Sequence, residues 1–134
     1  AMGLAKKIGL TVANAEIRRA GDRSFLLVER YDRIRGDNGV LRRLHQEDFC
    51  QALGFTSERK YSADGGPIFR DCFDLLRRAA TRPAVEVLKL FDAAIFNLII
   101  GNADAHAKNF SLLHRENGAI ELAPLYDLLS TVYY

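Results

Sequence analysis

Polar residues whose types suit phosphoryl transfer are concentrated between residues 102 and 109 and occur again at Asp127. Asp104 and Asn109 have the spacing D-x-x-x-x-N, in which the carboxylate can accept a proton from a substrate hydroxyl and the amide oxygen can bind Mg²⁺. Asp127 would add a second hard oxygen ligand, and Mg²⁺ on a nucleoside triphosphate takes one or two carboxylates besides the phosphate oxygens. The three residues together could therefore support phosphoryl transfer.

The spacing alone leaves other interpretations open. Asp104 and Asn109 could instead cap the loop by accepting hydrogen bonds from nearby backbone N–H groups. His106 and His114 could join carboxylates in a hydrolytic metal site, but the sequence contains no H-x-x-x-H or H-E-x-x-H pair, which disfavours a transition-metal centre. His45 fits a loop or the start of a helix better than a metal ligand.

The elements around these residues should place them at the end of a rigid helix. Apolar residues on most sides of the segment from Ala84 to about Ile100 predict a central buried helix, which Gly101 ends. A polar segment at the end of such a helix is well placed to form a site. Residues 110–113 and 119–122 then predict a small hairpin that returns the chain toward Asp127.

The rest of the chain predicts another hairpin, further helices and loops. In order, the pattern indicates a helix that ends at Gly9, strands at 11–17 and 24–29, a loop from Tyr31 to Val40, a short helix from Gln46 to Leu53, an irregular segment at 55–66, and a helix from Pro67 to about Ala80. Two strands alone do not make a stable sheet, so either the first hairpin packs on the helices or further strands are missing.

The composition is that of one globular domain. The chain has 134 residues, of which 49% are hydrophobic and 27% charged, and a formal net charge of +2, so no direct contact with nucleic acid is predicted. Cys50 and Cys72 lie in apolar helical patterns, which favours buried free thiols over one disulfide and indicates the cytoplasm. No signal peptide is apparent and no apolar stretch is long enough to cross a membrane.

Five segments, taken together and in order, resemble the signature blocks of the HipA family, the serine/threonine kinase toxins of bacterial toxin–antitoxin pairs. The resemblance implies an α+β, mainly α, protein-kinase-like fold. Residues 1–31 would be the end of the small lobe and the hinge, and residues 32–134 a partial helical lobe. The blocks are 27–33 (LVERYDR), 43–54 (RLHQEDFCQALG), 63–67 (ADGGP), 101–111 (GNADAHAKNFS) and 123–130 (APLYDLLS).

The resemblance also implies roles for single residues. Asp104 would be the general base, and Asn109 and Asp127 would hold Mg²⁺ beside ATP. The residues implied to bind the nucleotide are Glu29, Arg30 and Tyr31 between the lobes, His106, Lys108 and Asn109 near the phosphates, and Tyr126 and Asp127 where ordinary protein kinases have D-F-G.

The chain departs from a complete kinase in two respects. Its ten glycines include no G-x-G-x-x-G, and no strand with a phosphate-binding lysine precedes the first helix. We therefore expect the chain to be a fragment of a longer kinase and to transfer no phosphate alone. The resemblance further implies a DNA-binding antitoxin partner and a protein substrate, with aminoacyl-tRNA synthetases among the family's targets.

Two other functions stay open on the sequence. The chain could be a degenerate kinase-like module that binds a partner without catalysis, although the retained Asp104, Asn109 and Asp127 argue against decay. It could also belong to a small-molecule kinase of the aminoglycoside or choline type, which shares the D-x-x-x-x-N loop. The blocks at 43–54 and 63–67 favour the toxin family.

Overall fold

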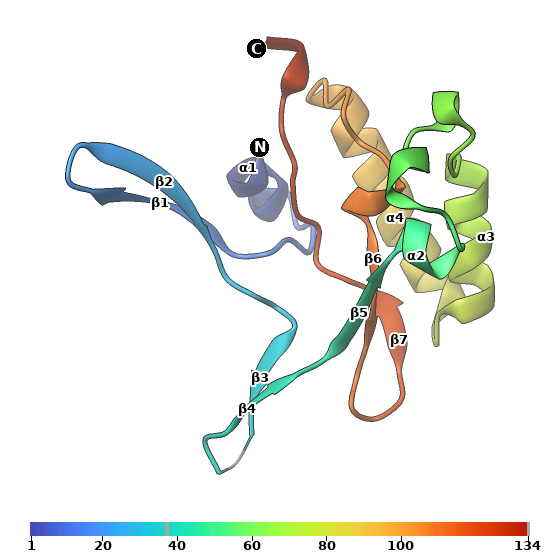
Figure 1. Cartoon of the computed structure of the whole chain (residues 1–134), viewed down its shortest axis with the longest axis horizontal. Coiled ribbons are helices and arrows are strands. Elements are labelled where there is room, and N and C mark those ends of the chain that lie inside the picture. The colour runs from blue at the N-terminus through green and yellow to red at the C-terminus, as the bar shows by residue number, and fades with distance from the viewer. Residues whose placement is uncertain (37, 134) are drawn as a thin grey trace.

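The computed structural model describes residues 1–36 and 38–133, which form a mixed α+β fold, and this confirms the α+β part of the predicted class (Figure 1). Asp37 and Tyr134, which fall within the predicted helical-lobe region, lie outside the described residues. The helices are α1 (Met2–Lys7), α2 (Phe49–Ala52), α3 (Phe69–Ala79) and α4 (Pro83–Ile99), and the strands are β1 (Ala15–Ala20), β2 (Arg23–Val28), β3 (Arg33–Arg35), β4 (Leu41–Arg43), β5 (His45–Asp48), β6 (Ser111–His114) and β7 (Ile120–Leu122).

A three-stranded antiparallel sheet in the order β5-β6-β7 forms the centre of the fold. All residues of its middle strand, β6, are buried except the last. Because successive side chains of a strand point to opposite sides, this strand is buried on both faces. Leu112 packs into the larger apolar cluster with residues of α2, α3 and α4, whereas Leu113 packs with Leu44 and Ala123 on the other face. The predicted hairpin at 110–122 is therefore formed by β6 and β7 and lies in the middle of the core.

The α4 helix is buried on one face only, so the prediction of a central buried helix is wrong for its outer side. Leu90, Ala93 and Phe96 are at most 4% exposed and face the core. Leu88 and Leu98 on the outer side are 62% and 81% exposed, because no described element packs over them. Among the described residues, no helix is both long enough and apolar enough to cross a membrane.

Both cysteines are buried and free, as predicted. Cys72 lies on the inner face of α3 and Cys50 in α2, within the same apolar cluster. Burial raises the pKa of the Cys72 thiol to about 12, since a thiolate would lose its hydration there. The thiols therefore act as small apolar side chains of the core.

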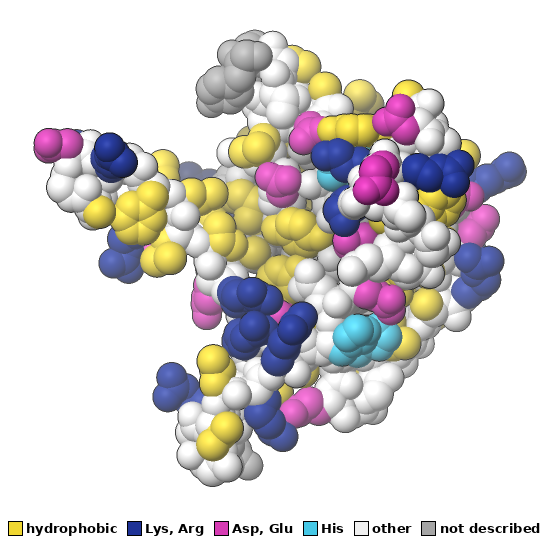
Figure 2. All heavy atoms as spheres, viewed as in Figure 1, with side chains coloured by type: hydrophobic (Ala, Val, Ile, Leu, Met, Phe, Trp, Pro, Cys, Tyr) yellow, Lys and Arg dark blue, Asp and Glu magenta, His cyan; other side chains and the backbone are white. Residues whose placement is uncertain are grey.

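The β1–β2 hairpin confirms that residues 11–29 form a hairpin, but its first strand is at 15–20 instead of 11–17. It projects away from the rest of the fold and, among the described residues, does not pack on the helices (Figure 1). Its six residue pairs run from Ala15 with Val28 to Ala20 with Arg23. Both strands are exposed along almost their whole length, and Figure 2 shows apolar side chains over this hairpin. Ile17 is 78% exposed and Leu26 is 58% exposed.

Two segments between residues 31 and 53 differ from the predictions. The expected loop from Tyr31 to Val40 contains β3, whose register places Arg33 opposite Arg43 of β4. The preceding Asp32 is 3% exposed and accepts hydrogen bonds from Arg30 and Arg33, and the Arg30 bond lowers its pKa below the ordinary value. The buried and paired carboxylate of Asp32 thus fixes the backbone where the chain enters the β3–β4 hairpin.

The expected helix from Gln46 to Leu53 is strand β5 followed by the single turn α2. The change occurs at Asp48, which has extended backbone angles and caps α2. Its Oδ1 accepts from the Gln51 backbone N–H and its own N–H donates to Gln51 Oε1, both at 2.9 Å. This capping box starts the helix at Phe49, so the preceding residues are free to pair with β6.

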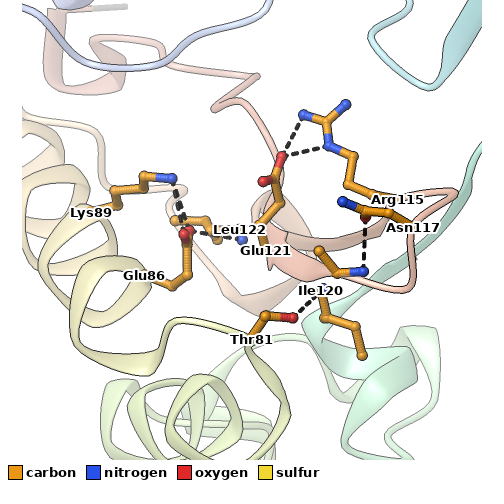
Figure 3. Close-up of polar contacts among 9 residues, drawn as sticks. Thr81, Glu86, Lys89, Arg115, Asn117, Ile120, Glu121 and Leu122 are labelled. Carbon is orange, nitrogen blue, oxygen red and sulfur yellow. Dashed lines mark hydrogen bonds and ion pairs between the residues drawn. The ribbon is translucent and has the colours of Figure 1, made fainter.

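Polar contacts at the start of α4 join the helices to β7 (Figure 3). Glu86 is 1% exposed, and its carboxylate accepts from the Leu122 backbone N–H at 3.1 Å and from Lys89 Nζ at 3.0 Å. Thr81 Oγ1 accepts from the Ile120 N–H at 2.8 Å. A buried carboxylate satisfied by two donors thus ties the sheet to the helical layer.

We expect Glu86→Ala to lower the free energy of unfolding by about 2 kcal/mol, because it leaves the buried Leu122 N–H without an acceptor. Denaturant unfolding of the full-length protein measures this change. The control is Glu121→Gln, on β7 next to Leu122. It alters only a partly exposed pair with Arg115 and should cost less than about 1 kcal/mol. Equal losses in the two variants would contradict the role given to Glu86.

Candidate functional site

The polar segment begins where α4 ends, at a glycine that the packing requires. Gly101 has a φ of +66°, and a Cβ at this position would collide with Cγ2 of Val132. The Gly101 carbonyl also accepts from the Thr131 backbone N–H at 3.0 Å. This close approach fixes the direction in which residues 102–109 leave the helix.

Asp104 is exposed, and its carboxylate is held by a residue that the sequence analysis did not single out. The Tyr61 hydroxyl donates to Asp104 Oδ1 at 2.7 Å, and the Asp104 N–H donates to Asn102 Oδ1 at 3.3 Å. Tyr61 belongs to the segment predicted as irregular, 43 residues away along the chain. Nothing in the local sequence indicates this contact.

The structure brings Asn109 and Asp127 together. Asn109 is 8% exposed, and its Nδ2 donates to Asp127 Oδ2 at 2.8 Å. Asn109 Oδ1 accepts from the His106 backbone N–H at 3.0 Å and keeps a second lone pair. The amide of Asn109 thus lies against the Asp127 carboxylate through its nitrogen and keeps a free oxygen lone pair. Carboxylate and amide oxygens are hard donors of the kind that Mg²⁺ prefers, so the donor types of these two residues fit the ion.

The backbone at Asp127 is unusual. Its φ of +56° is in the left-handed region, and it is the one non-glycine residue with positive φ in the described part of the chain. Aspartate and asparagine enter this region more readily than other side chains. Backbone strain of this kind is commonly found at functional sites.

Lys108 is paired with Asp48, another residue outside the predicted set. Lys108 Nζ lies 2.9 Å from Asp48 Oδ2, while Oδ1 of the same carboxylate caps α2. The hydrogen bond to Asp48 raises the pKa of Lys108, so the ammonium stays charged. The capping pattern of Asp48 with Gln51 is the one sequence signal that could have pointed to this residue.

His106 lines a pocket of about 440 Å³ with Tyr61, Phe69 and Ala103. Its Nδ1 is buried without a hydrogen-bond partner in the part of the chain that the structure describes. The ring packs edge-on against Tyr61, with centroids 5.0 Å apart. The pocket therefore adjoins the tyrosine that holds Asp104.

A second pocket of about 440 Å³ gathers most of the residues predicted to bind a nucleotide. Tyr31 and Tyr126 stack there with centroids 6.3 Å apart, and the Tyr126 hydroxyl donates to the Lys108 carbonyl at 2.8 Å. Burial raises the pKa of the Tyr126 phenol to about 12. The predicted residues that line this pocket are Glu29, Arg30, Tyr31, Tyr126 and Asp127, and the other lining residues include Val28, Gln46 and Leu128.

Two of the predicted residues in this pocket, Glu29 and Arg30, form side-chain hydrogen bonds with neighbouring residues. Glu29 Oε2 accepts from Asn14 Nδ2 at 2.8 Å. The Arg30 guanidinium donates to both oxygens of Asp32, at 2.8 and 2.6 Å. Of the predicted phosphate-side residues, His106 lines the other pocket, and Lys108 faces Asp48.

Comparison with known proteins identifies relatives over the whole chain. The family model described as the HipA-like C-terminal domain matches residues 1–134. The chain is 64% identical over 133 residues to "Putative kinase Y4mE" of Sinorhizobium fredii, covering 99% of this chain and 31% of the relative. It is 40% identical over 146 residues to "Serine/threonine-protein kinase toxin HipA" of Shewanella oneidensis, covering 99% and 33%.

A solved structure agrees with these matches. The complex of HipA, HipB and operator DNA from Shewanella oneidensis contains a chain that superposes with a TM-score of 0.90 at 36% sequence identity, covering 99% of this chain and 34% of that one. The chain thus spans about a third of the length of the relatives it matches. Since the family match extends from the first residue to the last, the chain belongs to the HipA-like C-terminal domain family.

Proposed function

We propose that the protein containing this chain is a serine/threonine protein kinase of the HipA toxin type, which transfers a phosphoryl group from Mg²⁺-ATP to a protein hydroxyl. The observation that carries the proposal is the 2.8 Å contact between Asn109 and Asp127, at the end of the loop that also presents Asp104. In this proposal residues 1–31 end a small lobe and residues 32–134 form part of a helical lobe.

Each residue has a part in the reaction. Asp104, oriented by Tyr61, accepts the proton of the substrate hydroxyl as that oxygen attacks the terminal phosphorus and the bond from this phosphorus to the bridging oxygen breaks, releasing ADP. Asn109 and Asp127 would hold Mg²⁺, which when bound neutralises charge on the phosphate oxygens. Lys108, fixed by Asp48, supplies a second positive charge. Tyr31, Tyr126 and the segment of Glu29 and Arg30 line the pocket for the base of the nucleotide.

The partners follow from the relatives. The HipA of the solved complex is bound to HipB and operator DNA, so we propose an antitoxin partner that binds DNA for this protein too. The substrate is a protein, for which the family resemblance points to aminoacyl-tRNA synthetases. We propose a cytoplasmic location, which such a substrate and the two free cysteines support.

A panel of acceptors tests the function. Full-length protein is incubated with Mg²⁺ and ATP labelled at the terminal phosphate, together with either a peptide mixture or small alcohols such as aminoglycosides and choline. The proposal predicts label on serine or threonine of peptides. Label on the small alcohols would favour a small-molecule kinase, and Mg²⁺-dependent ATP binding without any transfer would favour a degenerate binding module.

We expect Asp48→Asn and Lys108→Met each to lower kcat/KM for ATP about tenfold. Asp48→Asn frees the Lys108 ammonium proposed to lie beside the phosphates, and Lys108→Met removes it. Asparagine is also a good N-cap, so Asp48→Asn keeps α2 in place. Steady-state kinetics of the two single variants and the double variant measure the effect. If the ion pair acts as a unit, the double variant loses no more than either single one, whereas additive losses would contradict the pairing.

A further inference from the structure

Two histidines and a glutamate lie together at the margin of the central sheet, outside the residues used above. His45 of β5 is the direct cross-strand partner of His114 of β6, and Glu47 lies two residues further along β5. Residues two apart on a strand share a face, so all three side chains point to the same side. Figure 2 shows histidine side chains in contact on the viewed face, beside an acidic one.

The three side chains converge. The His114 Nε2 lies 3.1 Å from Glu47 Oε1, and the rings of His45 and His114 have centroids 4.7 Å apart. One ligand atom from each residue can be chosen so that all lie within 4.8 Å of one another. Ligands of a tetrahedral zinc ion are separated by roughly 3.3 Å, so small rotamer changes close the remaining gap. His45 is exposed, which leaves its ring room to turn.

The donor types select the class of metal. Imidazole nitrogen suits Zn²⁺, Co²⁺, Ni²⁺ and Cu²⁺, whereas Mg²⁺ and Ca²⁺ take oxygen ligands. Two histidines and one carboxylate, with a position left for water, are a recurring zinc ligand set. The arginines next to the cluster in the sequence face other carboxylates, Arg43 facing Asp32 and Arg115 facing Glu121, so neither neutralises Glu47.

We propose that His45, Glu47 and His114 form a binding site for a borderline divalent transition metal ion, with Zn²⁺ as the best fit. The site is separate from the pair Asn109 and Asp127 and does not depend on the proposed kinase activity. Its ligands come from two strands, one directly before α2 and one after the 102–109 loop. Bound metal would therefore cross-link β5 to β6 and stabilise the sheet that supports both α2 and the loop.

The test measures metal binding by the full-length protein after treatment with a chelator, in excess Mg²⁺ so that oxygen sites are filled. Zn²⁺ binding is followed by calorimetry and Co²⁺ binding by visible absorption, which is intense for tetrahedral nitrogen and oxygen ligation. We expect one Zn²⁺ site that the double variant His45→Asn/His114→Asn weakens by at least about 100-fold, since loss of supporting residues alone costs 10- to 100-fold. Zn²⁺ should also raise the melting temperature of the wild type but not of this variant.

Two further variants make the result unambiguous. Glu47→Gln keeps the shape of the side chain and replaces the carboxylate ligand with a neutral amide, so it should weaken Zn²⁺ binding even if the double variant fails to fold. Glu116→Gln, the same change on the turn between β6 and β7, should leave Zn²⁺ affinity unchanged. Absence of Zn²⁺ binding in the wild type, or equal Zn²⁺ affinity in wild type and Glu47→Gln, would overturn the proposal.

Discussion

Replacing Asp104 with asparagine in the full-length protein should reduce phosphoryl transfer by at least about 10³-fold and leave nucleotide affinity nearly unchanged. The substitution removes the group that accepts the hydroxyl proton, and general-base catalysis contributes about 10²- to 10⁴-fold. The amide keeps the shape of the side chain and an oxygen that can accept from Tyr61. Initial rates with labelled ATP measure transfer, and calorimetry measures nucleotide binding.

A second substitution distinguishes the role of Asp104 as the base from the role of Tyr61 in orienting it. Tyr61→Phe removes only the hydroxyl that donates to Asp104 at 2.7 Å, so the Asp104 carboxylate is retained but is less well oriented. The expected loss is about tenfold, the rate equivalent of one hydrogen bond to a charged group. Wild-type turnover in Asp104→Asn would remove the proposed base, and a larger loss in Tyr61→Phe than in Asp104→Asn would reverse their roles.

Replacing Asp127 with asparagine should weaken Mg²⁺-dependent ATP binding by at least about 100-fold and abolish measurable transfer. The change removes the one carboxylate of the predicted Mg²⁺ ligand pair, and a neutral amide is a much weaker partner for a hard cation. Asparagine suits the left-handed backbone at this position, with its φ of +56°, so the loop need not rearrange. Alanine would add backbone strain and confuse the two effects.

The control for Asp127→Asn is ATP binding without Mg²⁺. Affinity measured with a chelator present should be similar in wild type and variant, because only the metal-dependent part of binding is lost. Equal loss with and without Mg²⁺ would show that Asp127 shapes the nucleotide pocket instead of holding the ion. Unchanged Mg²⁺-dependent affinity would contradict its assignment.

The sequence predicts the segments whose apolar pattern and local stop signals agree. The α3 and α4 helices follow from periodic apolar residues, Pro83 at the start of α4 and Gly101 after it. The β6–β7 hairpin follows from two short apolar runs around an Asn-Gly turn. These elements place Asn109 near Asp127, so the pair could be predicted from spacing and the returning hairpin.

Contacts between distant segments could not be predicted in this way. The segment at 45–48 has helix-compatible residues, but pairing with β6 and capping by Asp48 make it a strand. Tyr61 reaches Asp104 across 43 residues, and no local pattern encodes that distance. The apolar residues on the outer side of α4 predict burial, yet burial depends on a partner element that the described residues do not supply.

The proposed kinase site depends on Asn109 and Asp127 binding Mg²⁺ together. The most direct test is a crystal structure of the full-length protein with a non-hydrolysable ATP analogue and Mn²⁺ in place of Mg²⁺. Anomalous scattering locates the manganese. We expect an anomalous peak in contact with side-chain oxygens of both residues and the nucleotide base beside Tyr31 and Tyr126. A bound nucleotide whose manganese lies away from Asp127 would contradict the proposed kinase site.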